Sequence, residues 1–157
     1  MFLRLKKVKG KEYCYLVENR WKSRQKVKKY LGATVRFESH KCDKDFHPEC
    51  FEKKTEDVLR DIVIWELIKI GFSDEGKVLQ KKNILFHKEK MNVRCESKKI
   101  VLAINEGYLC DFTLKRILSF RKSDDIKKDG VELARRFVDA GLNVPKEVFI
   151  EFFKALR

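Results

Sequence analysis

The first 32 residues alternate hydrophobic and polar positions with the period of β-strands. Tyr13 and Tyr15 alternate with Cys14 and Leu16, and Gly10 suits a tight turn before them. This pattern predicts a three-stranded antiparallel meander, which is too small to be stable alone and must pack on a helix. The predicted strands are FLRLKKV (2–8), EYCYLVE (12–18) and RQKVKKYL (24–31).

Most of the remaining chain shows helical periodicity. Residues 33–54 have no clear period and connect the meander to TEDVLRDIVIWELIKIGF (55–72), a central core helix that Thr55 caps and Gly71 ends. Residues 83–104 favour two strands joined around 96–98, with a helix as the alternative. Further helices are predicted at 112–120 after an Asp111 cap, at 131–141, and at 145–156 with Pro145 at the first helical position, with a polar loop at 121–130.

These elements predict an α+β fold with two regions. Residues 1–75 form a basic β-meander with its core helix. Residues 76–157 form an α-rich region with a small β-hairpin and a C-terminal helical hairpin. The longest apolar stretch, residues 62–72, is interrupted by Glu66 and Lys69 and is too short to span a bilayer, so we expect a cytoplasmic protein without membrane contact.

The charge of the chain is high and unevenly distributed. Charged residues make up 39 % of the sequence, against about 25 % in an average soluble protein. The excess of Lys and Glu with little Gln or Pro is typical of proteins from hot habitats. Residues 1–32 hold eleven Lys and Arg against two acids, which gives +9 of the net charge of +13, and residues 81–100 add +5. Such a concentration favours a polyanionic partner.

The third predicted strand places cations at the spacing that a nucleic-acid backbone requires. Arg24, Lys26 and Lys28 point to one side of a pleated strand, about 6–7 Å apart, while Lys29 points to the other. We therefore expect a non-enzymatic nucleic-acid-binding protein whose N-terminal β-face contacts phosphates. The expected contacts here are Arg20, Trp21, Lys22, Arg24, Lys26, Lys28 and Lys29.

The aromatic residues of the meander have two interpretations. Tyr13 and Tyr15 either pack in the core against the helix at 55–71 or stack on bases, and their type favours the core. Trp21, in the loop before the third strand, is the exception and is expected to be exposed.

The same segment carries a family resemblance. YCYLVE (13–18), a short variable loop and RQKVKKYLG (24–32) resemble the N-terminal segment of a group of DDE-type insertion-sequence transposases. Similar segments open some stand-alone archaeal proteins. The resemblance covers about 30 residues, implies nucleic-acid handling and favours DNA slightly over RNA. Nothing after residue 33 resembles the catalytic domain of that group, so strand transfer is not implied.

A cluster of His and Cys residues predicts a possible zinc site. His40, Cys42, His47 and Cys50 lie within eleven residues, and zinc takes four nitrogen or sulfur ligands. The spacing differs from that of common zinc sites, so a polar loop with small buried cysteines is the alternative.

A helix-turn-helix is a further hypothesis for DNA contact. Ala103 and Gly107 have the spacing that leads into a recognition helix, which would turn Lys115 and Arg116 toward DNA. The turn is one residue too long, and residues 100–104 favour a strand.

Two other functions remain open from the sequence. The Phe-rich C-terminal helix, with Phe149, Phe152 and Phe153 on one face, is a possible dock for a protein partner in a ribonucleoprotein or regulatory complex. A metal-dependent nuclease using His87 and Glu89 is less favoured, because no glycine-rich phosphate loop or nucleophile motif accompanies them.

Overall fold

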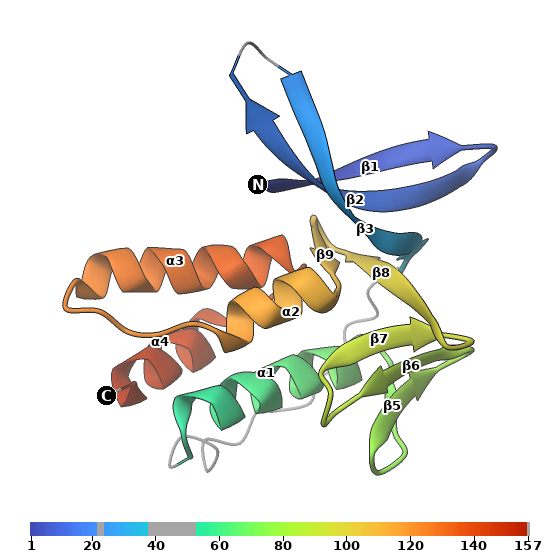
Figure 1. Cartoon of the computed structure of the whole chain (residues 1–157). Helices are drawn as coiled ribbons and strands as arrows, with labels where there is room; N and C mark the ends of the chain where they lie inside the picture. Colours follow the sequence, from blue (N-terminus) through green and yellow to red (C-terminus); the bar gives the residue numbers. More distant parts are fainter. Residues whose placement is uncertain (22–23, 38–52, 157) are drawn as a thin grey trace.

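The structure of the protein is a computed structural model that describes residues 1–21, 24–37 and 53–156. A basic meander lies at one end of the molecule, and a body of helices packed on a second group of strands lies below it (Figure 1). The meander consists of β1 (Phe2–Val8), β2 (Lys11–Arg20) and β3 (Arg24–Arg36). The body strands are β4 (Ser73–Asp74), β5 (Val78–Lys81), β6 (Ile84–His87), β7 (Asn92–Cys95), β8 (Lys98–Ile104) and β9 (Gly107–Leu109). The helices are α1 (Thr55–Lys69), α2 (Asp111–Leu118), α3 (Ile126–Asp139) and α4 (Lys146–Ala155).

One hydrogen-bonded path of strands joins the meander to the body, in the order β1-β2-β3-β8-β7-β6-β5-β4, with β9 also paired to β8. The link is a parallel pairing of β3 with β8, from Ala33 opposite Ile100 to Arg36 opposite Ala103. The other pairings are antiparallel. The sheet therefore contains strands from both of the regions that the sequence predicts.

Gly32 makes the close approach of β3 to β8 possible. Its φ is +140°, and a Cβ there would lie 2.6 Å from the carbonyl oxygen of Lys99. A side chain at this position would meet backbone atoms, which cannot move aside as the end of a long side chain can. Glycine is therefore required where the meander meets the body.

The hydrophobic core has two parts. The larger part lies within the body, between α1–α4 and strands β5–β9. The smaller part lies under the meander, where Cys14, Leu16 and Leu31 contact Val101 and Cys110. The meander thus packs on β8, β9 and the beginning of α2, and the expectation that its rings pack on α1 is wrong.

The α+β fold class and the antiparallel meander are confirmed, with β3 extending to Arg36. Residues 83–104 contain three strands rather than two, because a second turn at 88–91 separates β6 from β7. The polar loop predicted at 121–130 is wrong from Ile126 onward, where α3 begins. Lys54, not Thr55, occupies the N-cap position of α1.

Among the described residues, no helix has both the length and the apolar character needed to cross a membrane.

Candidate nucleic-acid interface

Strands β2 and β3 extend beyond the small core as a two-stranded ribbon, which we define as residues 17–21 and 24–28. Leu16 and Leu31 are the last side chains that the smaller core buries on this side of the strands. Past them the ribbon projects away from the helices (Figure 1). Two register shifts, between Cys14 and Tyr15 and between Leu16 and Val17, interrupt the pairing of β2 with β3. Such bulges increase the local twist of a strand pair and turn it away from the sheet.

One face of the ribbon carries four cations, which we call the cation face: Arg20, Arg24, Lys26 and Lys28. Arg20 is paired across the strands with Arg24, and Glu18 is paired with Lys26. Because residues two apart on a strand share a face, these two pairs lie on the same side of the ribbon. Lys28 joins them, since its Nζ lies 2.8 Å from the Glu18 carboxylate. The alignment that the sequence predicts for Arg24, Lys26 and Lys28 is thus present.

Within the part of the chain that the structure describes, most of this positive charge is not neutralised. Arg20, Arg24 and Lys26 form no ion pair with any residue that the structure describes. Only Lys28 has a carboxylate partner, and its hydrogen bond lowers the pKa of Glu18 below the ordinary value. Both side chains of that pair are exposed to solvent, and surface ion pairs of this kind contribute little stability. The contact between Lys28 and Glu18 can therefore be broken at small cost.

The remaining N-terminal candidates differ in their positions. Trp21 lies at the end of the ribbon with 90 % of its surface exposed, as the sequence predicts. Strict alternation predicts that Lys29 lies on the side opposite the cation face. Because of the second bulge, however, Lys29 is paired with Leu16 and lies on the same side as the cation face. Lys22 lies outside the described residues.

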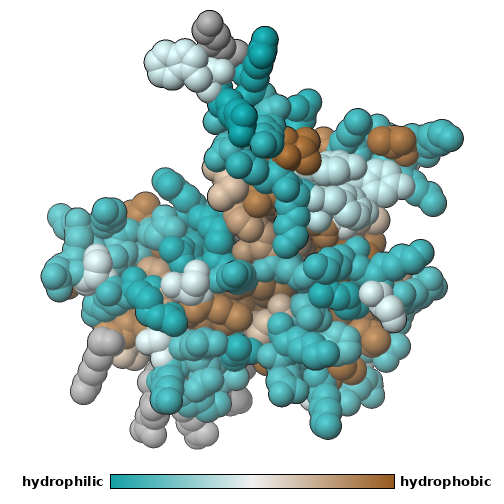
Figure 2. All heavy atoms as spheres, viewed as in Figure 1, coloured by the Kyte–Doolittle hydropathy of each residue, from teal (hydrophilic) through white to brown (hydrophobic). Residues whose placement is uncertain are grey.

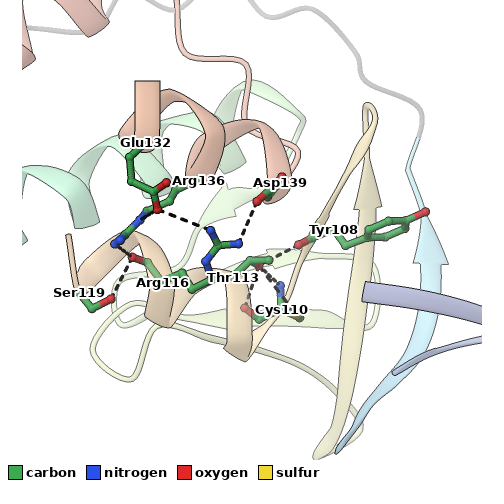
Figure 3. A network of polar contacts seen from close by, with 8 residues as sticks. All are labelled: Tyr108, Cys110, Thr113, Arg116, Ser119, Glu132, Arg136 and Asp139. Carbon is green, nitrogen blue, oxygen red and sulfur yellow. Dashed lines mark hydrogen bonds and ion pairs between the residues drawn. The ribbon is translucent and has the colours of Figure 1, made fainter. Parts of the chain in front are cut away.

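Lys115 and Arg116 do not belong to this surface. Both are on α2 in the body, and the residues before α2 form the β8–β9 hairpin, so the helix-turn-helix hypothesis is wrong. Arg116 reaches α3, where it donates to Asp139 at 2.9 Å and lies 3.7 Å from Glu132 (Figure 3). Its charge is therefore met by two carboxylates, while Lys115 is exposed.

The polar network around Arg116 has a structural role. Arg136 of α3 donates to the carbonyl oxygen of Arg116, and this bond ties α3 to α2 (Figure 3). Arg136 also donates to the carboxylate of Glu132, on its own helix. Thr113, at the beginning of α2, donates to the carbonyl oxygen of Tyr108 at 2.8 Å. These bonds hold α2 against both α3 and β9 and leave Arg116 little freedom to contact a ligand.

The zinc hypothesis falls outside the described residues, because His40, Cys42, His47 and Cys50 all lie between 38 and 52. In the part of the chain that is described, no group of three or more His, Cys, Asp or Glu residues is placed to hold a metal ion.

The Phe-rich helix α4 turns its rings toward the body. Phe152 is buried, and Phe149 and Phe153 are half-buried and packed on the larger core. The ring of Phe149 meets that of Phe137 edge-on at 6.4 Å and stacks on that of Phe153 at 5.9 Å. The rings thus serve the packing of α3 and α4.

The outer face of the meander carries tyrosine rings, and for two of them, Tyr13 and Tyr15, the sequence allows either core packing or base stacking. Tyr13, Tyr15 and Tyr30 belong to neither part of the core, so the preference for buried rings is wrong. Cys14 and Leu16, the alternate positions of β2, are buried instead. The signal was present in the sequence: of two alternating sets on one strand, the less polar set faces the core.

Comparison with known proteins gives no further guide: no protein-family model, curated protein or solved structure matches this chain.

Proposed function

We propose that the protein binds nucleic acid without catalysing a reaction, and that the cation face contacts the phosphates. The observation that carries this proposal is that Arg20, Arg24 and Lys26 lie on one side of a projecting ribbon and form no ion pair with the described residues. A two-stranded ribbon is narrow enough to enter the major groove or to lie along a strand. The exposed Trp21 at its end adds an aromatic surface.

DNA is slightly preferred over RNA, because the segment that forms the ribbon resembles the N-terminal part of DDE-type transposases. We also propose a cytoplasmic location. The cysteines that the structure describes, Cys14, Cys95 and Cys110, are free thiols, which suits a reducing compartment.

The test is a charge reversal on the cation face. The triple variant Arg24→Glu, Lys26→Glu and Lys28→Glu should lose retention on DNA and RNA at moderate salt. Each lost phosphate contact should also reduce the salt dependence of binding, by about 0.7–0.9 in the slope of log K against log salt. Binding is measured by gel shift at two salt concentrations.

A matched control separates this effect from net charge. Lys127, Lys128 and Lys146 are exposed and lie at the N-terminal ends of α3 and α4, where an acidic side chain is favourable. Changing all three to Glu alters the net charge by the same amount and should leave most binding intact. Unchanged affinity and salt slope in the triple ribbon variant, with the fold preserved, would show that the cation face is not the site.

A further inference from the structure

The outer face of the meander displays a group of aromatic rings with cations beside them, which we call the tyrosine face: Arg4, Lys6, Tyr13, Tyr15 and Tyr30. The ring centroid of Tyr30 lies 5.4 Å from that of Tyr15 and 6.4 Å from that of Tyr13. Tyr30 is 50 % exposed, and Tyr13 and Tyr15 are partly exposed. In the space-filling view, side chains of intermediate hydropathy lie among hydrophilic ones over the meander (Figure 2).

The charge on this face has one sign. Arg4 is paired across the strands with Tyr15, and Lys6 with Tyr13, so both cations adjoin the rings. Arg4 donates a hydrogen bond to the side chain of Gln25, and Lys6 has no ion pair among the described residues. The acids of β2, Glu12 and Glu18, occupy alternate positions and therefore lie on the opposite face. Among the residues that the structure describes, the face thus combines aromatic surface with positive charge and no carboxylate.

We infer that the tyrosine face binds the unpaired bases of a single-stranded nucleic acid. This inference rests on the proposed function and adds to it a second surface, on the side of β2 opposite the cation face, with its own class of ligand. Every base has a π-face that can stack on an aromatic side chain, and cations beside the rings attract the phosphates that link the bases. A duplex offers its bases only along the edges in the grooves, so it cannot cover these rings in the same way.

The spacing and tilt of the tyrosine rings suit bases that are not stacked on one another. The centroid distances of 5.4 Å and 6.4 Å exceed the spacing of about 3.4 Å between stacked bases. The rings are also tilted by 53° and 46° to one another, so neither contact is a face-to-face stack. A single strand whose bases are splayed apart can place one base on each ring, because the rings are not stacked on one another.

The experiment compares two pairs of substitutions at the same positions. Tyr15→Leu with Tyr30→Leu removes both rings but keeps apolar bulk, whereas Tyr15→Phe with Tyr30→Phe keeps the rings and removes the hydroxyls. The probes are a labelled oligothymidylate, an oligouridylate and a DNA duplex of the same length. Affinity is measured by fluorescence anisotropy at two salt concentrations, and the thermal midpoint of each variant shows whether the fold is preserved.

We expect the wild type to prefer the single strands over the duplex, and the Leu pair to lose about 10- to 100-fold in affinity for them. The Phe pair should retain nearly all of it. The salt slope should stay the same in both, because no cation is removed. The two single-stranded probes show whether the strand is DNA or RNA.

Two results would overturn the inference: equal affinity of the wild type for duplex and single strand, or undiminished binding by a folded Leu pair. In either case, loss of binding in the Arg24, Lys26 and Lys28 triple variant would leave the proposed function standing. If the wild type bound none of the three probes, the proposed function itself would fail.

Discussion

The meander and the body use their positive charges differently. In the body, cations meet acids on neighbouring elements: Arg94 of β7 donates to Asp111 of α2, and Arg116 of α2 to Asp139 of α3. In the meander, Arg20, Arg24 and Lys26 have no such partner among the described residues. The paired cations of the body therefore hold elements together, whereas Arg20, Arg24 and Lys26 hold no carboxylate of the described residues and can attract an anion.

The two regions also differ in how their cores are built. The body encloses a large core between helices and strands, whereas the meander contributes a few side chains to a small core shared with β8, β9 and α2. The meander depends on the body for its stability, and the parallel pairing of β3 with β8 is the principal link. Each prediction below changes one side of this contrast.

The largest effect is expected from breaking the link at Gly32. The substitution Gly32→Ala combines an unfavourable φ of +140° with a clash against the carbonyl oxygen of Lys99. It should lower the free energy of unfolding by roughly 2–5 kcal/mol, measured by urea denaturation. Gly10→Ala is the control, because φ is +79° there but no atom lies within 4 Å of the added Cβ. That variant should lose only about 1–2 kcal/mol, and an equal loss in both would show that the β3–β8 approach is not tight.

Charge reversal should reduce stability more at a cation of the body than at a cation of the meander, and both effects should be smaller than that of Gly32→Ala. Arg116→Glu removes the partner of Asp139, leaves Glu132 paired with Arg136 alone, and adds a third acid beside them, which should cost about 1–3 kcal/mol. Arg24→Glu should change stability by less than about 0.5 kcal/mol, because Arg24 has no ion pair with any described residue to lose.

Nucleic-acid binding should be weakened more by Arg24→Glu than by Arg116→Glu, the reverse of the order expected for stability. Arg24→Glu should weaken retention of nucleic acid, and Arg116→Glu should leave it nearly unchanged while the fold persists. Thermal unfolding and gel shifts on the same two variants test both halves. If Arg116→Glu were neutral for stability but harmful for binding, Arg116 would belong to the interface after all.

Local pattern was sufficient for the parts of the fold that have strong periodicity. Alternation and Gly10 predicted the meander, and the apolar face of 55–72 predicted α1. The strand β5 was missed, and β6 and β7 were predicted as one strand, because each of the three has only four residues. Some of their turns also use non-glycine residues at positive φ, such as Met91 and Glu96, which carry no turn signal.

The candidate site was predictable to the extent that it follows alternation. The alignment of Arg24, Lys26 and Lys28 needed only the two-residue period of a strand. The position of Lys29 depends on a bulge that no glycine or proline marks. The neutralisation of Arg116 depends on α3, whose Asp139 is 23 residues away in sequence, and such pairing appears only when the helices are packed.

The smallest effect concerns the acids of the two regions. Burial raises the pKa of Glu66 in α1, although Lys69 at 3.0 Å opposes this. Hydrogen bonds from Arg36 and Lys28 lower the pKa values of Glu12 and Glu18 in the meander. A carboxyl with a raised pKa disfavours the folded state as pH rises through that pKa, and one with a lowered pKa contributes stability that is lost as pH falls through it.

On acidification, Glu66 should therefore take up its proton before Glu12 and Glu18. An NMR titration of the side-chain carboxyls measures the order, and Glu66→Gln assigns the first signal by removing it. Protonation of Glu66 together with the other two would mean that Lys69 and the Asn143 amide, 3.3 Å away, fully offset its burial. In the expected order, the meander keeps its few ion pairs while the buried acid of the body is already neutral. Mild acid should then leave the fold of the meander, and the cations it presents, intact.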